Sequence, residues 1–156
     1  WRGNYGYIRT VPLDAFGYVN WGAASSWQGF PQATPPRAQE EYIIGNFAIQ
    51  RVFWQDNTCT QYKYPLGDFG NRKYAEGTIT SCPTLIPGSG DIQSYTAWVV
   101  NDQLREGMWR NNKGYTRILQ LNSAKTGAVG ETTVQWTECC SGTGPHAQGV
   151  YILNHP

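Results

Sequence analysis

The chain has 156 residues with 12 basic and 11 acidic side chains, so its formal net charge is only +1. Such a balance gives no long-range field for nucleic acid or an anionic membrane, and no apolar run approaches the roughly 18 residues of a membrane-spanning helix. Charged residues are scarce at 15%, while aromatic residues reach 14% and glycines number 18, a composition typical of secreted β-proteins.

Short runs with period-two patterning alternate with Gly, Pro and Asn, which is the pattern of an all-β protein. The first half is predicted to hold five strands, Tyr5–Val11, Phe16–Trp21, Tyr42–Trp54, Thr60–Tyr64 and Tyr74–Ser81. We expect the longest of them to bend at a bulge at Gly45. One short helix is expected after Thr34, because Pro35 suits a first helical position and Arg37–Glu41 would continue it.

The second half is predicted to hold five more strands, Ile92–Val100, Leu104–Arg110, Tyr115–Leu121, Thr132–Cys139 and Gly149–Leu153. The clearest element is the hairpin formed by the second and third of these strands. Its connection, residues 111–114, contains Asn and Gly, which supply the positive φ angles that tight turns need.

The number of strands predicts the architecture of the whole chain. No linker interrupts the sequence, so we expect one domain over residues 1–156. About ten strands in this length favour a single antiparallel β-barrel, since closure removes vulnerable edges, with a β-sandwich as the alternative. A β-trefoil is less favoured: Trp54, Trp98 and Trp136 recur at spacings of 44 and 38 residues, but the segments around them do not align.

Four cysteines, Cys59, Cys82, Cys139 and Cys140, are present, and the last two are adjacent. An even number without the His/Cys spacing of a metal site indicates disulfides, which persist in oxidising compartments. Because the chain also begins at Trp1, we expect the mature form of a secreted, extracellular protein whose signal peptide and pro-segment have been removed.

Two disulfide pairings remain open. If Cys139 and Cys140 lie on a strand, their side chains point to opposite faces, and each could reach Cys59 or Cys82 in a long-range bond. The alternative joins Cys59 to Cys82 and leaves a vicinal Cys139–Cys140 bond. Loop-closure entropy favours the long-range bonds by only about 1 kcal/mol each, so strain decides between the pairings.

The residues that could support catalysis are few. The only histidines are His146 and His155, and a Cys140–His146 nucleophilic pair would require a free thiol. No nucleophile elbow, phosphate-binding loop or metal-ligand spacing occurs. A carboxylate pair such as Glu76 and Glu138 cannot be tested without a distance. We therefore predict no enzymatic activity, no catalytic residue, no metal and no cofactor.

Features that suggest binding gather on the hairpin. Trp and Arg are enriched at the energetic centres of protein interfaces, and Asn side chains at a turn offer hydrogen bonds. The candidate partner-binding residues are Trp109, Arg110, Asn111, Asn112 and Lys113. A secreted lectin, with aromatic faces on sugars and amides on hydroxyls, is the alternative function, and a small extracellular hydrolase is a further one.

The size of the chain, its N-terminus Trp1-Arg2-Gly3 and its cysteines at 59, 82, 139 and 140 resemble a known class of proteins. They are similar to the necrotrophic effectors, host-selective protein toxins that cereal-pathogenic fungi secrete. This resemblance implies a β-rich, disulfide-bonded monomer that acts in the plant apoplast without catalysis. It also implies a virulence role, in which binding of a host plant protein, either a pathogenesis-related class 1 protein or a sensitivity-gene product, induces genotype-dependent necrosis.

Overall fold

The computed structural model describes residues 5–8, 11, 18, 20–31, 36–68, 70–83 and 86–143 of the chain. The sequence predicts one domain over residues 1–156, whereas the contacts within the structure gather the chain into two compact units, Trp1–Pro35 and Pro36–Pro156. The predicted strand Gly149–Leu153 and both histidines lie outside the described residues.

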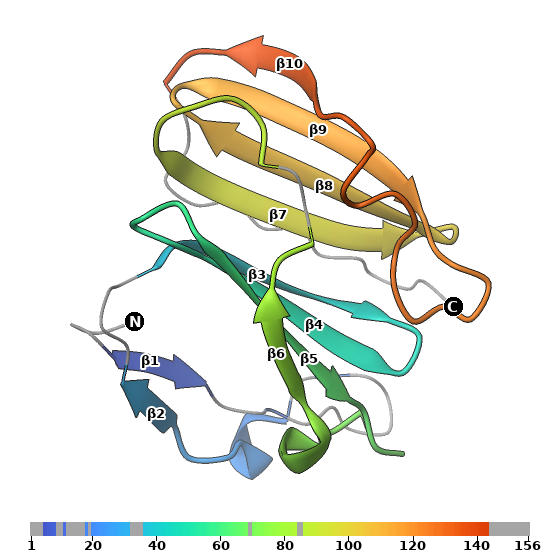
Figure 1. Ribbon diagram of the computed structural model, residues 1–156. Helices are drawn as coiled ribbons and strands as arrows, with labels where there is room; N and C mark the ends of the chain where they lie inside the picture. The colour runs from blue at the N-terminus through green and yellow to red at the C-terminus, as the bar shows by residue number, and fades with distance from the viewer. Residues whose placement is uncertain are drawn as a thin grey trace. The chain divides into compact units, whose positions relative to one another are not determined.

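The first unit holds a two-stranded antiparallel sheet. Strand β1 (Tyr5–Ile8) pairs with β2 (Gln28–Pro31), and a short 3-10 helix, η1 (Trp21–Ala23), lies between them in the chain (Figure 1). Asn20 caps this helix by accepting a hydrogen bond from the amide of Ala23. Strand β1 confirms part of the prediction Tyr5–Val11. Half of the predicted strand Phe16–Trp21 lies outside the described residues, and its described residues are not extended as a strand, since Trp21 begins η1.

The second unit begins with a four-stranded antiparallel sheet in the order β3-β4-β5-β6. Its strands are β3 (Pro36–Ile44), β4 (Phe47–Trp54), β5 (Cys59–Pro65) and β6 (Thr78–Ser81). A second 3-10 helix, η2 (Tyr74–Glu76), directly precedes β6, so the predicted strand Tyr74–Ser81 is only half extended.

The other sheet of this unit has the order β10-β9-β8-β7. Its strands are β7 (Ile92–Val100), β8 (Gln103–Arg110), β9 (Lys113–Gln120) and β10 (Thr137–Ser141). Two-residue turns join β7 to β8 at Asn101-Asp102 and β8 to β9 at Asn111-Asn112, and all four residues have positive φ angles. The predicted hairpin is therefore confirmed, with its turn shortened to two residues.

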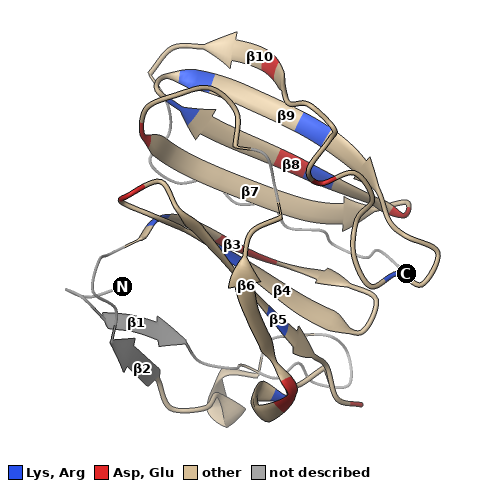
Figure 2. Cartoon of the chain, in the orientation of Figure 1, with Lys and Arg blue, Asp and Glu red and all other residues tan. Residues whose placement is uncertain are grey.

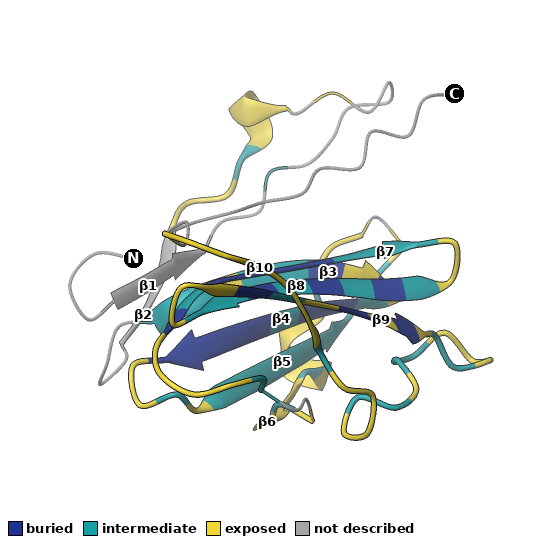
Figure 3. Cartoon of the chain, turned by 90° about the horizontal axis from the view of Figure 1, so that it is seen from above, coloured by how far each residue is buried: buried dark blue, intermediate teal, exposed yellow. Residues whose placement is uncertain are grey.

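The two sheets of the second unit pack against one core (Figure 3). The core draws its side chains from β3 and β4 on one sheet and from β7, β8 and β9 on the other: Tyr42, Ile44, Ile49, Phe53, Ile92, Tyr95, Ala97, Leu104, Met108 and Leu119. The all-β, antiparallel class is confirmed. The sheets are not closed into a barrel, which corrects that detail in favour of two packed sheets.

Residues 36–44, the segment of the predicted helix, form strand β3, so the helix prediction is wrong. The run Arg37–Glu41 has good helix propensity, but Tyr42 and Ile44 fill the core only when the segment pairs along β4. Gly45 lies in the tight β3–β4 turn rather than at a bulge. Its φ is +54°, and a Cβ there would lie 2.3 Å from the carbonyl oxygen of Lys125, so only glycine fits.

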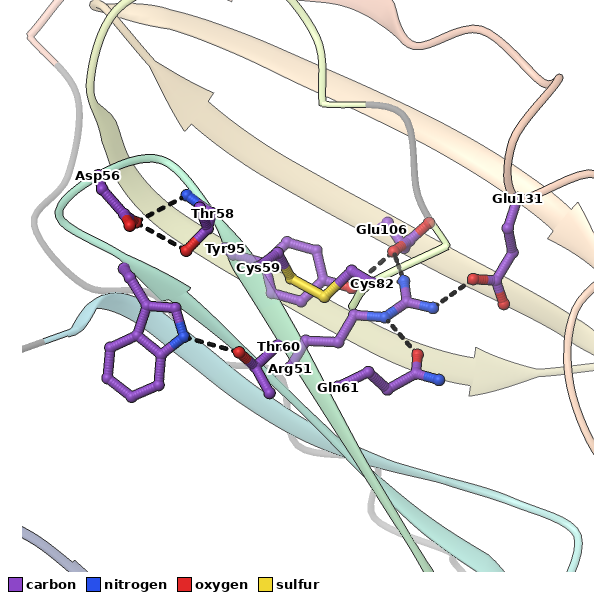
Figure 4. Close-up of a disulfide and its surroundings, with 11 residues drawn as sticks. Arg51, Asp56, Thr58, Cys59, Thr60, Gln61, Cys82, Tyr95, Glu106 and Glu131 are labelled. Carbon is purple, nitrogen blue, oxygen red and sulfur yellow. Dashed lines mark hydrogen bonds and ion pairs between the residues drawn. A yellow bond between two sulfur atoms is a disulfide. The ribbon is translucent and has the colours of Figure 1, made fainter. Parts of the chain in front are cut away.

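One disulfide joins Cys59 to Cys82, with their Cα atoms 5.3 Å apart. Of the two pairings that the sequence left open, the long-range one is excluded, and the Cys59–Cys82 bond of the alternative is confirmed without its vicinal bond. Cys59 is the first residue of β5, and Cys82 directly follows β6, the strand that pairs with β5. The amide of Cys82 also donates to the carbonyl of Cys59 at 3.0 Å. Cys139 and Cys140 lie on β10 in the other sheet and carry free thiols. Figure 4 shows this bond, whose Cys59 packs against the core.

Candidate functional site

The tip of the β8–β9 hairpin is fastened to the segment that leads into β7. The backbone amide of Asn111 donates to the carbonyl of Asp91 at 3.0 Å. Asn112 and Gln93 exchange two hydrogen bonds: the Asn112 amide donates to Gln93 Oε1 at 2.8 Å, and Gln93 Nε2 donates to Asn112 Oδ1 at 2.9 Å. The tip is thus held in one conformation before any ligand arrives.

Arg110 holds the loop that precedes β7. Its guanidinium donates to three backbone carbonyls, those of Pro87, Gly88 and Gly90, at 2.7 to 2.9 Å. Gly90 has a φ of +89° and approaches Asn111 so closely that a Cβ would lie 3.0 Å from that of Asn111. Arg110, predicted to contact a partner, therefore orders a loop of its own chain.

The other predicted residues of the hairpin also have partners within the chain. Lys113 Nζ lies 2.9 Å from Glu138 Oε2, and this hydrogen bond raises the pKa of the Lys113 ammonium. The half-buried Trp109 ring lies beside Gly114 on β9. Of the five predicted residues, Asn111 and Asn112 alone are turn residues that line the cleft described next.

A polar cleft of about 520 Å³ opens at this end of the second unit. Both sheets contribute to it, through the start of β3, the β4–β5 turn, the start of β7 and the β8–β9 turn. Its lining consists mainly of amides and one charge pair: Pro36, Arg37, Gln55, Asp91, Ile92, Gln93, Asn111 and Asn112. We call this feature the hairpin cleft.

The charge pair of the hairpin cleft joins the two sheets. Arg37 Nη2 lies 3.0 Å from Asp91 Oδ1, and Arg37 Nε donates to the carbonyl of Gln55 at 3.2 Å. The Asp91 side chain is 62% exposed, so its carboxylate can accept further hydrogen bonds from a ligand. The cleft therefore presents a fixed carboxylate among amide groups that both donate and accept.

Sequence reasoning found two of the cleft residues and missed the others. Asn111 and Asn112 were marked by their turn chemistry. Arg37 was predicted to lie on a helix, and Asp91 carries no local signal beyond preceding the predicted strand Ile92–Val100. Only the contact between β3 of one sheet and β7 of the other brings Arg37 to Asp91, which lies 54 positions further along the chain.

A second cluster of charges lies between the sheets, and its members are buried except for the partly exposed Glu131. Arg51 on β4 contacts two carboxylates, with Nη1 2.6 Å from Glu106 and Nη2 2.5 Å from Glu131. Arg117 Nε lies 2.6 Å from the second oxygen of Glu106. Figure 4 shows the Arg51 guanidinium between these carboxylates, and Figure 2 shows the acidic position of β8 beside the basic one of β9.

This buried cluster is closed to substrates. Two guanidinium groups meet two carboxylates, so the formal charges cancel, and Tyr95 donates to Glu106 at 2.5 Å. Burial raises the pKa of the Tyr95 hydroxyl. The Arg51 guanidinium loses solvation, yet the nearby Tyr95, Tyr42 and glutamates keep its pKa well above the ordinary value. Glu106 is 1% exposed, so this carboxylate serves the fold rather than a ligand.

Arg117 shows why a predicted strand begins later than expected. Its Nη1 donates to the carbonyl of Glu131 at 2.9 Å, and its guanidinium lies 4.6 Å from the Trp136 ring centroid. These contacts hold the turn at residues 131–134 over the cluster, so only Thr137–Ser141 of this region is extended as β10. The predicted strand Thr132–Cys139 is corrected accordingly.

The chain matches no protein-family model, no curated protein and no solved structure. Among the described residues, no helix has the length and apolar character needed to cross a membrane. Within the same residues, no group of three His, Cys, Asp or Glu side chains could hold a metal ion. Glu76 and Glu138 lie in different sheet regions, each with its own lysine, Lys73 and Lys113.

Proposed function

We propose that this chain is a secreted binding protein that recognises a host plant protein through the hairpin cleft and acts without catalysis. The observation that carries the proposal is the cleft itself, in which residues from both sheets present amides and one charge pair at fixed positions. Its polar lining suits the backbone and polar side chains of a protein segment better than an apolar small molecule.

The intramolecular bonds of the cleft support this proposal. Arg110 orders the loop before β7, and Gln93 orders Asn112, so little conformational entropy remains to be lost on binding. Asp91 keeps most of its side chain exposed although it is paired with Arg37. A preordered surface with one accessible charge can select a partner by charge and hydrogen-bond complementarity.

The proposed setting comes from the cysteines and from the resemblance to necrotrophic effectors of cereal-pathogenic fungi. The Cys59–Cys82 bond supports an oxidising compartment. In this setting the protein acts in the apoplast as a monomer. Its partner there is a pathogenesis-related class 1 protein or a sensitivity-gene product, and binding leads to genotype-dependent cell death.

Infiltration of the purified protein into leaves of several host genotypes tests this function. Necrosis confined to certain genotypes is expected. Asn112→Gly should weaken the response, because it removes the side-chain amide but tolerates the φ of +60°. Asn101→Gly is the matched control, since Asn101 has a φ of +51° in the turn at the other end of β8.

Two results would contradict the proposal. The first is an equal response in every genotype or in none, which would remove the effector function. The second is an equal loss of response in both variants, which would separate necrosis from the hairpin cleft.

A row of tyrosines favours a second candidate function, carbohydrate binding. The rings of Tyr62 and Tyr64 stack with centroids 6.4 Å apart, and Tyr74 meets Tyr64 edge-on at 5.1 Å. Tyr74 is 45% exposed. Aromatic faces of this kind can stack on sugar rings. A glycan array should then give a reproducible ligand that Tyr74→Ala weakens, and an array without any ligand would remove this candidate.

A further inference from the structure

Cys139 and Cys140 lie on the same side of β10 because the strand is bulged. Glu138 pairs with Tyr115 and Cys140 pairs with Gly114, so Cys139 is an extra residue in the register. Neighbouring side chains normally alternate between the faces of a strand, and a bulge interrupts this alternation. The two Sγ atoms consequently lie 2.9 Å apart, and both residues are exposed.

Gly114 on the neighbouring strand makes room for the two sulfurs. A Cβ at this position would lie 2.4 Å from Cys140 Sγ and 3.1 Å from Cys139 Sγ. Trp109 closes the same space, with its Cζ2 atom 3.3 Å from that point. The bulge and the glycine together hold two thiols against each other at the surface, an arrangement that neither feature would produce alone.

A bond between the two sulfurs requires only a small movement. An S–S bond is about 2.05 Å long, so the present separation of 2.9 Å must shorten by about 0.85 Å. A disulfide between adjacent residues closes a small strained ring, and strained or exposed disulfides are the easily reduced ones. The hydrogen bond with Cys140, followed by burial, raises the pKa of the Cys139 thiol and so favours its protonated form.

We propose that Cys139 and Cys140 form a reversible thiol–disulfide modification site that reacts with small-molecule disulfides of the glutathione type. The thiolate of one cysteine attacks the small disulfide, which forms a mixed disulfide and releases one small thiol. The thiolate of the other cysteine then attacks the protein-bound sulfur of the mixed disulfide and releases the second small thiol. The protein loses two electrons and two protons, and the small disulfide gains them.

Equilibration of the whole protein in glutathione buffers of graded potential tests this proposal. After rapid alkylation, peptide mapping should show an intramolecular Cys139–Cys140 bond that opens at a more oxidising potential than Cys59–Cys82 in the same sample. Cys140→Ser cannot close the ring, so it should accumulate glutathione on Cys139. Thiols that stay unreacted, or a glutathione adduct that persists in the unsubstituted protein, would overturn the proposal.

Gly114→Ala tests the role of the bulge and the glycine. Its methyl group occupies the space of the sulfurs, so the closing equilibrium should weaken at least tenfold, which equals about 30 mV for a two-electron couple. Gly127→Ala is the matched control, because a Cβ there meets nothing closer than 4.0 Å. Equal closing potentials in the two variants would contradict the assigned geometry, and Cys140→Ser keeps the proposal testable if Gly114→Ala does not fold.

Discussion

The interior between the two sheets and the end of the β8–β9 hairpin each contain an arginine–carboxylate pair, but the interior pair is buried and the pair at the hairpin end is partly exposed. Between the sheets, Arg51 and Glu106 are buried and meet at 2.6 Å. At the hairpin end, Arg37 and Asp91 meet at 3.0 Å but remain partly exposed. The cysteines differ in the same way: Cys59 and Cys82 form a disulfide, whereas Cys139 and Cys140 on β10 are exposed free thiols.

This difference separates residues that build the fold from residues that can serve a ligand. A buried charge must have all its partners within the protein, because an unpaired one costs several kcal/mol. An exposed pair contributes little to stability and can exchange its partner for a ligand. Substitutions in the interior should therefore lower the free energy of unfolding, whereas substitutions at the hairpin end should weaken ligand binding and leave stability nearly unchanged.

The largest expected effect comes from the interior. Glu106→Gln leaves Arg51 and Arg117 buried beside a neutral amide, which should lower the free energy of unfolding by about 3–5 kcal/mol. Urea unfolding followed by circular dichroism measures this loss. Glu138→Gln makes the same chemical change in the exposed pair with Lys113 and should leave the unfolding midpoint unchanged. Equal unfolding midpoints for the two variants would contradict the claim that the buried ion pairs stabilise the fold more than the exposed one.

The bonded cysteines should have the next largest effect. Replacing both Cys59 and Cys82 by serine opens a loop of 23 residues, for which chain entropy predicts a loss of about 3 kcal/mol. Replacing both Cys139 and Cys140 by serine removes no existing bond and should leave the unfolding free energy close to that of the original protein. A larger loss from the β10 pair would show that those thiols, and not Cys59–Cys82, stabilise the fold.

The smallest effect on stability is expected at Tyr42, a buried hydroxyl without a hydrogen-bond partner among the described residues. Burial raises its pKa in the folded state, whereas an unfolded tyrosine loses its proton near pH 10. Above about pH 10 the unfolded chain therefore binds fewer protons than the folded one, and stability falls as pH rises.

Tyr42→Phe removes this titration, so its unfolding free energy should fall less steeply above about pH 10 and stay within about 1 kcal/mol of the original near pH 7. Tyr95→Phe offers a contrast. It also removes a buried titrating hydroxyl, but it takes a hydrogen-bond donor from Glu106 and should cost stability already at pH 7. Identical alkaline slopes for Tyr42→Phe and the original protein would refute the assigned burial.

Residue patterning and turn residues correctly predicted the elements whose conformation depends mainly on nearby residues. Strand β7 was predicted with its observed bounds, and the β8–β9 hairpin followed from the asparagines of its turn. The first six residues of β3 were missed, because its helix-forming run becomes extended only through pairing with β4 and burial of Tyr42 and Ile44. The sequence left the disulfide pairing open for a related reason, since the positions of Cys139 and Cys140 depend on a bulge in the register of β10 with β9.

The candidate site shows the same limit. Asn111 and Asn112 could be found from turn chemistry alone. Asp91 and Arg37 could not, because their proximity depends on how two sheets meet. The buried partners of Arg51 lie 55 and 80 residues away in the chain, and nothing local distinguishes Arg51 or Arg117 from a solvated arginine.

The most direct test of the hairpin cleft compares Asp91→Asn with Asp102→Asn on the same preparations. Both carboxylates are exposed to a similar degree, 62% and 63%, and each is paired with one cation, Arg37 or Lys125. Both variants should unfold at the urea concentration of the original protein. Asp91→Asn alone should raise the dose for half-maximal necrosis, by about tenfold for each 1.4 kcal/mol of lost binding. Full activity of Asp91→Asn, or an equal loss in Asp102→Asn, would contradict the account.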